Sequence, residues 1–168
     1  MEKLIDLYNK WSGKAPANVE KMEGAGSNRS YYRMTDEDGK TVIGVVGTSR
    51  DENHAFVYLC QHFTQRQLPV PKILAVTDDE TRYLQTDLGT TSLFDAIRGG
   101  RQAGGRYNLY EQELLRKAIK ELPNLQIRGA RGLDYSYCYP QPEFNQESVL
   151  FDLNYFKYCF LKATDLDF

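Results

Sequence analysis

The chain has 168 residues, of which 41% are hydrophobic, 26% charged and 12% aromatic. This length suits one domain, or one domain and the start of another, and the composition excludes a disordered chain, a collagen-like repeat and a disulfide scaffold. Its 21 Lys and Arg against 23 Asp and Glu give a net charge of -2, which argues against a nucleic-acid or anionic-membrane partner. No apolar run is long enough for a membrane span, and the N-terminus lacks a signal peptide's apolar core. We therefore expect a cytoplasmic protein.

The cysteines and histidines do not have the spacing of a metal site. Cys60, Cys138 and Cys159 lie far apart without a C-x-x-C pair, and His54 and His62 have no third ligand nearby. We expect neither a disulfide framework nor a metal ion held by protein groups alone.

The first 98 residues alternate between helix and strand patterns. Apolar residues at positions 4, 8 and 11 predict a short N-terminal helix. Four strands and a second helix follow, separated by turn residues. Their expected bounds are 30–35 and 41–46 for the first two strands, 52–67 for the helix, and 72–77 and 81–86 for the last two strands. This order predicts an α+β fold in which one helix packs on an antiparallel sheet.

The second part of the chain is predicted to be helical. A short helix over 93–97 ends at Gly99 and Gly100, and the glycine-rich residues 99–108 form a linker. We therefore divide the chain into a lobe at 1–98, the linker at 99–108 and a helical region at 109–168. Residues 123–146 are expected to form an irregular aromatic loop between two apolar helices.

The most suggestive local motif is the glycine turn Gly-Ala-Gly-Ser-Asn-Arg-Ser at 24–30. Glycines let the backbone approach a bulky anion, and Ser27, Asn28 and Arg29 supply donors and charge for phosphate oxygens. A plain hairpin loop has the same composition. The motif leads into a strand and lacks a following Lys-Ser/Thr, so it is neither a Walker loop nor a dinucleotide fingerprint.

The order of the motifs over residues 24–97 is more specific than any single one. A glycine loop, a strand, an acid opening a helix, Leu-Pro-Val-Pro and Tyr-Leu-Gln-Thr-Asp-Leu-Gly follow one another. In this order, and in SNRSYYRM, QLPVPKILAV and YLQTDLGTTSLFDAI, the chain resembles the aminoglycoside phosphotransferase and choline kinase superfamily, which has a protein-kinase-like fold. It is most similar to the bacterial branch that phosphorylates N-acetylmuramate or N-acetylglucosamine. The resemblance continues more faintly through FDLNYFKYCFL at 151–161.

The resemblance implies a kinase-like N-terminal lobe, followed by the first helices of a truncated C-terminal lobe. The implied nucleotide-site positions are Gly26, Ser27, Asn28, Arg29, Glu52, Gln85, Thr86, Asp87 and Leu88. The first four would cover the ATP phosphates, and Glu52 would orient a phosphate-binding lysine. The last four would form the hinge, with backbone groups on the adenine edge and Leu88 against the ring. Judged on the sequence alone, Glu52 is explained equally well as an acid stabilised by the helix dipole.

Two departures from the family pattern limit these expectations. The strand at 42–46 reads Val-Ile-Gly-Val-Val and has no lysine, so Arg29, Arg33 or residues outside the chain must supply the positive charge. Glu52 would then lose its usual partner. The chain also lacks a His-x-Asp-x-x-x-x-Asn catalytic loop. Asp87-Leu88-Gly89 imitates a magnesium motif but follows the hinge strand, so we assign no catalytic residue and no metal ligand.

These features predict the N-terminal part of a larger ATP- and magnesium-dependent kinase acting on a small-molecule hydroxyl, such as a sugar hydroxyl. We expect the isolated chain to be inactive, and ATP to stabilise it little or not at all. The last helix has one stripe formed by Val149, Leu153, Phe156 and Phe160 and is apolar on most other sides. We therefore expect its residues 151–161 to pack against the rest of the C-terminal lobe or to self-associate. One alternative is a non-catalytic kinase-like interaction module, and a weaker one is a nucleotide or RNA binder using the aromatic residues of 30–33. A catalytic loop encoded downstream would favour the kinase.

Overall fold

The computed structural model describes residues 1–23 and 28–164. The chain divides into two compact units, Met1–Leu133 and Asp134–Phe168. The glycine-rich residues 99–108 lie inside the first unit, where Arg98–Gln102 forms the short helix α4. The proposed division into lobes at this stretch stays a prediction.

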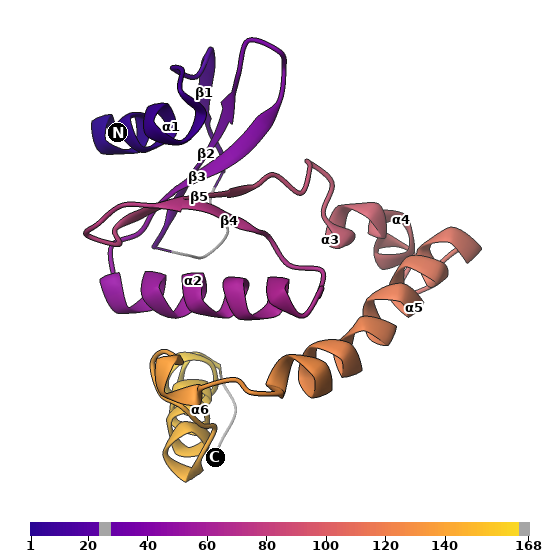
Figure 1. The fold of residues 1–168 in the computed structure, drawn as a ribbon. Helices are drawn as coiled ribbons and strands as arrows, with labels where there is room; N and C mark the ends of the chain where they lie inside the picture. Colours follow the sequence, from indigo (N-terminus) through magenta and orange to yellow (C-terminus); the bar gives the residue numbers. More distant parts are fainter. Residues whose placement is uncertain (24–27, 165–168) are drawn as a thin grey trace. The chain divides into compact units, whose positions relative to one another are not determined.

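The first unit is built on one antiparallel sheet (Figure 1). Its five strands lie in the order β1-β2-β3-β5-β4, and each neighbouring pair is antiparallel. The strands are β1 (Asn18–Lys21), β2 (Ser30–Thr35), β3 (Thr41–Val46), β4 (Ile73–Val76) and β5 (Arg82–Thr86). The expected α+β class is confirmed, and β2 and β3 have the predicted bounds because alternating aromatic and β-branched residues favour strands on both sides of the Asp-Gly turn.

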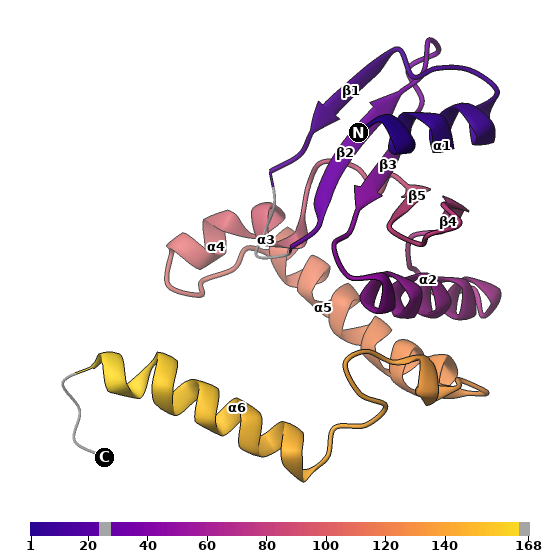
Figure 2. The same ribbon diagram turned by 90° about the vertical axis from the view of Figure 1, so that its left-hand side faces the viewer.

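Helices cover both faces of this sheet, as Figures 1 and 2 both show. The N-terminal helix α1 (Glu2–Ser12) buries Leu4, Leu7 and Tyr8 in a cluster with Met34, Val42 and Leu84. The opposite face presents Ile43, Val45 and Tyr83, and Phe56 and Val57 of α2 (Arg50–Gln65) pack against them. The sequence predicted one helix packed on the sheet. A second one is found because β2, β3 and β5 carry apolar side chains on both faces.

Tyr83 lies at the centre of the α2-covered face and offers a test of that packing. It is fully buried, and its hydroxyl has no hydrogen-bond partner among the described residues. Burial also raises the pKa of this phenol. Tyr83→Phe removes an unsatisfied buried polar group, so the free energy of unfolding in urea should stay equal or rise by up to about 1 kcal/mol. Tyr83→Ala, as the control, should lower it by about 3–5 kcal/mol. A marked loss of stability in Tyr83→Phe would contradict this account.

The helices after the sheet correct two expectations. Gly99 and Gly100 do not end a helix but lie within α4, where the buried Gly100 N–H donates to Glu111 Oε1 at 2.8 Å. The loop expected from residue 123 begins later, because α5 (Leu109–Pro123) continues into a π-helical turn at Asn124–Arg128. Proline lacks an amide proton and disturbs the regular hydrogen-bond ladder of an α-helix without always ending the helix. A short helix α3 (Leu93–Ala96) precedes α4.

The second unit contains one long helix, α6 (Gln146–Cys159), flanked by 3-10 turns at Tyr135–Tyr137 and Leu161–Ala163. Asn145 caps α6 by accepting hydrogen bonds from the Glu147 and Ser148 amides. Within the described ranges, the chain forms no helix with the length and apolar character needed to cross a bilayer.

Candidate functional site

An arginine and a glutamate meet where β2 begins beside the first turn of α2. Arg29 Nη2 lies 3.0 Å from Glu52 Oε1, and it also donates to the Glu52 carbonyl oxygen at 3.1 Å. Ser49 caps α2 and accepts a hydrogen bond from the Glu52 amide, so Glu52 lies in the positively polarised first turn. The strand lysine that was expected as the usual partner of Glu52 is absent from β3. In the structure Arg29 forms the ion pair with Glu52 instead.

The Arg29 side chain is held on three sides and is only 11% exposed. Its Nε donates to Asn53 Oδ1 at 3.3 Å, and its guanidinium carbon lies 5.1 Å from the centre of the Phe56 ring. An arginine fixed in this way keeps its charge and orientation with little loss of entropy when it binds an anion. The contacts that hold Arg29 thus come from Glu52, Asn53 and Phe56 of α2.

Asn53 connects this arginine to the sheet. It is 1% exposed, and its Nδ2 donates to the Glu80 carbonyl oxygen at 2.9 Å. Gly47, just after β3, packs directly on the Asn53 amide, leaving no space there for a Cβ atom. Glu80 in turn pairs with Arg50 at 3.0 Å and with His54 at 2.7 Å, and these contacts lower the pKa of the Glu80 carboxyl.

The predicted hinge lies at the far end of the same sheet. Arg33, Ile43 and Gln85 form one row across β2, β3 and β5. The four residue steps from Arg29, just before β2, to Arg33 span about 14 Å of extended chain. Gln85 lies two residues after Tyr83 on β5 and therefore on the α2-covered face. Its Oε1 is buried and accepts no hydrogen bond from the described residues. A buried acceptor of this kind is available to a donor from water or a ligand.

The other hinge residues differ in what they offer a ligand. The Thr86 N–H donates to the Lys72 carbonyl oxygen at 3.0 Å, so it is used within the sheet. Leu88 is 72% exposed and presents an apolar surface. Asp87 has a structural partner, because its carboxylate accepts hydrogen bonds from Arg33 Nε at 2.7 Å and Nη2 at 3.2 Å. The Arg33 guanidinium is therefore tied to the hinge, whereas the Arg29 guanidinium lies beside the first turn of α2.

The remaining predicted positions at the glycine loop are less informative. Gly26 and Ser27 lie outside the described residues, and Asn28 is exposed two residues before β2. Among the described residues, no group of three His, Cys, Asp or Glu side chains has the arrangement of a metal site. The ion pair between Arg29 and Glu52 was missed because its partners are separated in sequence and neither is unusual by itself.

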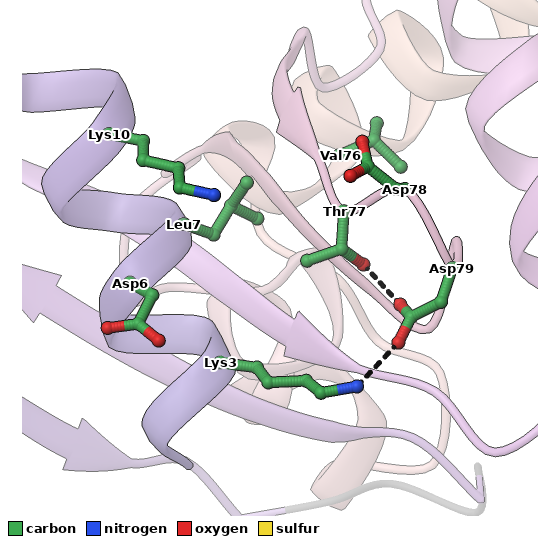
Figure 3. Close-up of a pocket in the computed structure, with 8 residues that line it drawn as sticks. All are labelled: Lys3, Asp6, Leu7, Lys10, Val76, Thr77, Asp78 and Asp79. Carbon is green, nitrogen blue, oxygen red and sulfur yellow. Dashed lines mark hydrogen bonds and ion pairs between the residues drawn. The ribbon is translucent and has the colours of Figure 1, made fainter.

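A separate cavity of about 370 Å³ lies between α1 and the turn after β4 (Figure 3). Leu7 and Val76 contribute apolar surface, while Lys3 Nζ pairs with Asp79 at 2.9 Å. The hydroxyl and amide of Thr81, with Lys3 and Thr77, hold the pKa of Asp79 well below its usual range. None of the predicted site residues lines this cavity. It is a charged, mixed-sign surface in which Lys3 is already paired.

Comparisons with known proteins give little direct information about function. No family model matches the chain, and no curated protein matches it. Among solved structures, the chain is similar to a candidate fructosamine-3-kinase from Thermobifida fusca YX-ER1, with 18% identity and a TM-score of 0.38. The match covers 63% of this chain and 38% of that one. The comparison is with a kinase, but likeness at this level does not distinguish the amino-sugar branch and carries no further argument.

Proposed function

We propose that the chain supplies the nucleotide-binding lobe of an ATP-dependent phosphotransferase acting on a small-molecule hydroxyl, with a sugar or amino sugar as the acceptor. The observation that carries this proposal is the ion pair between Arg29 and Glu52 beside the glycine loop. It gives a fixed cation next to the positive end of α2, and both features favour the phosphate groups of a nucleotide.

In this proposal the nucleotide extends from the hinge to Arg29, which lie toward opposite ends of the sheet. Gln85 would accept a hydrogen bond from the adenine amino group, and Leu88 would cover the ring. The phosphates would lie about 14 Å away, where Arg29 is oriented by Glu52 and Asn53. Phosphoryl transfer depends mainly on positioning the reactants and neutralising their charge. This chain would position the nucleotide, which is the phosphoryl donor, and neutralise charge on its phosphates.

The catalytic residues of the proposed reaction would lie outside this chain. The 168 residues contain no His-x-Asp-x-x-x-x-Asn sequence, so the group that positions the acceptor hydroxyl would come from residues beyond this chain. When bound, Mg²⁺ neutralises charge on the nucleotide phosphates, and its protein ligands would also lie beyond this chain. We therefore expect no phosphorylation of N-acetylmuramate or N-acetylglucosamine by the pure protein. Detectable magnesium-dependent transfer would contradict the proposal that this is only the nucleotide lobe.

A nucleotide titration followed by amide NMR tests the binding site. With a non-hydrolysable Mg-ATP analogue, we expect fast-exchange shifts at Asn28, Arg29, Glu52 and the hinge, with a Kd weaker than about 1 mM. Affinity this weak gives almost no thermal stabilisation at millimolar ligand. Arg29→Gln should weaken binding about tenfold or more, because a charge-assisted contact to phosphate contributes about 1.5–3 kcal/mol.

Arg50→Gln is the matched control for this titration. Arg50 also lies in the first turn of α2 and also pairs with a glutamate, but its partner is Glu80 in the turn before β5. We expect the control to bind the nucleotide as the unchanged protein does, and both variants to retain the amide spectrum of a folded chain. No shifts up to 10 mM, or shifts centred on Lys3 and Asp79, would contradict the proposed site.

One observation favours a second function, a kinase-like module that binds another protein without catalysis. The helix α6 exposes large apolar side chains, including Phe151 and Tyr155. An exposed apolar surface of this size is more often a protein-binding surface than one that stays in contact with solvent. Nucleotide binding that is abolished by Arg29→Gln favours the phosphotransferase, whereas a folded protein that binds no nucleotide favours the interaction module.

A further inference from the structure

The C-terminal end of α2 packs against residues 128–131, where the π-helical turn after α5 ends. Both segments belong to the first compact unit, and Figures 1 and 2 both show the end of α5 beside α2. Nε2 of the buried His62 lies 2.7 Å from the Gly129 carbonyl oxygen. A Cβ atom at Gly129 would lie only 3.0 Å from the Phe63 ring. The two segments are therefore in direct contact and share one surface.

Three arginines, Arg66, Arg128 and Arg131, lie at this junction, and we call them the arginine cluster. Arg66 Nε donates to the Arg131 carbonyl oxygen at 2.8 Å, and Arg128 Nη2 donates to the Arg66 carbonyl oxygen at 3.0 Å. Each segment thus extends an arginine side chain onto the other. Glycine at position 132 leaves room for the Arg66 guanidinium, because a Cβ atom there would lie only 3.2 Å from Arg66 Nη2. Arg66 is partly exposed, and Arg128 and Arg131 are exposed.

Within the described ranges, no carboxylate neutralises the arginine cluster. None of its members takes part in an ion pair there. The stretches 53–77 and 122–133, which contain the cluster, include no Asp or Glu. Glu121 and Asp134, the acids on either side of the second stretch, already accept hydrogen bonds from neighbouring residues. The junction therefore keeps a local positive charge, although the whole chain has a net charge of -2.

The arginine cluster also has unused hydrogen-bond donors. Arg128 donates through Nη2 alone, and the Arg131 side chain donates to no other residue that the structure describes. A guanidinium presents its N–H groups as a planar fork that fits two oxygens of one anion at once. Arg66 is already held by carbonyl oxygens of both segments, so it loses little entropy when an anion binds. Three positive charges at one short junction suit a single dianionic group rather than the repeated phosphates of a nucleic acid.

We propose that the arginine cluster binds a phosphate monoester, carried either by a small molecule or by a phosphorylated peptide. Such a group has a charge of about −1.5 to −2 at neutral pH and three acceptor oxygens, whereas a carboxylate has one charge and two oxygens. Clustered arginines recognise phosphate groups in this way. From Glu52 to Gln65, α2 extends about 20 Å, so this site is separate from the proposed nucleotide site. The proposal is independent of nucleotide binding.

Amide NMR of the full chain, titrated with inorganic phosphate, tests the site. We expect saturable shifts at Arg66 and at residues 128–132 below about 20 mM phosphate. Sodium chloride at equal ionic strength should leave these amides nearly unshifted, because it screens charge without forming bidentate contacts. No saturable shift, equal shifts with chloride, or shifts confined to Arg29 and Glu52 would overturn the proposal.

Single substitutions assign the binding to the arginine cluster. Arg131→Gln removes an exposed guanidinium that makes no side-chain hydrogen bond to a described residue, so the variant should fold and bind phosphate about tenfold more weakly. Arg128→Gln should weaken binding to a similar extent. Arg98→Gln is the matched control, because Arg98 is equally exposed to solvent but already pairs with Asp95 at 2.9 Å, and its replacement should leave the Kd unchanged. Folded Arg131→Gln and Arg128→Gln variants that bind phosphate as the unchanged chain does would overturn the proposal.

Two phosphate esters distinguish the sources of the ligand. Glucose 6-phosphate represents a small molecule, and a short phosphoserine peptide represents a phosphorylated protein. At least one of them should bind more tightly than inorganic phosphate and shift the same amides, and the tighter one identifies the source. The same peptide with glutamate in place of phosphoserine should bind about tenfold more weakly. A glutamate peptide that binds equally well, a single-stranded oligonucleotide that binds more tightly than both esters, or esters that bind no better than inorganic phosphate would overturn the proposal.

Discussion

Replacing Asp87 with asparagine is expected to lower the free energy of unfolding by about 3–5 kcal/mol, the usual cost of leaving one partner of a buried ion pair without its counter-ion. Asp87 is 8% exposed and Arg33 17% exposed, and their two hydrogen bonds measure 2.7 and 3.2 Å. Arg33 also donates to the Gly89 carbonyl oxygen at 3.1 Å. The pair thus joins β2 to the segment after β5, and urea unfolding of Asp87→Asn measures its contribution.

An exposed ion pair provides the control for this measurement. Lys14 and Glu37 are 3.5 Å apart and about three quarters exposed, so Glu37→Gln should change stability by less than about 1 kcal/mol. The double variant Arg33→Met/Asp87→Leu removes both charges and should be less destabilised than Asp87→Asn. Equal losses in Asp87→Asn and Glu37→Gln would contradict the assignment of a buried pair.

The same carboxylate predicts an acid-dependent loss of stability. Hydrogen bonds from Arg33, opposed by partial burial and supported by the Gly89 amide, lower the pKa of Asp87 to about 2. Because the folded-state pKa lies below that of the unfolded chain, the stabilisation is complete above about pH 5 and is lost as the pH falls toward 2. Asp87→Asn should lose that part of the pH dependence, which urea titrations at several pH values would reveal.

Replacing Gly47 with alanine is expected to lower the free energy of unfolding by about 2–4 kcal/mol. The added Cβ would overlap the side-chain amide of Asn53, which is almost completely buried. Moving that amide breaks its 2.9 Å hydrogen bond to the Glu80 carbonyl oxygen and its contact with Arg29. Overpacking costs about 1–3 kcal/mol, and an unsatisfied buried polar group costs a similar amount. Chemical denaturation of the variant measures the sum.

A double-mutant cycle separates the clash from any other effect of Gly47→Ala. In an Asn53→Ala background the amide is absent, so the added methyl group has space and should cost less than about 1 kcal/mol. If Gly47→Ala costs the same in both backgrounds, the contact with Asn53 is not the reason for the glycine at this position.

Local patterns predicted the strands and the helix that hold the candidate site. The β-branched run at Thr41–Val46 and the acids at Asp51 and Glu52 act over a few neighbouring residues, so the sequence alone determined these elements. The same applies to the Asp-Gly turn before β3. Helix ends were less certain, since α2 covers Arg50–Gln65 rather than the predicted 52–67. The glycines of α4 and the continuation of α5 past Pro123 depended on longer-range packing, including the contact between Gly100 and Glu111.

The partners of the charged side chains were decided only by the tertiary structure. The sequence named Arg29, Arg33, Glu52 and Asp87 as candidate residues, and thereby determined the chemistry available to the site. It did not determine the pairs, because Arg29 and Glu52 are 23 positions apart and Arg33 and Asp87 are 54 apart. Antiparallel pairing of β2, β3 and β5 brings those positions together, and α2 then places Glu52 and Asn53 beside Arg29. Ion pairing depends on distance and burial in space, and neither is encoded in local sequence patterns.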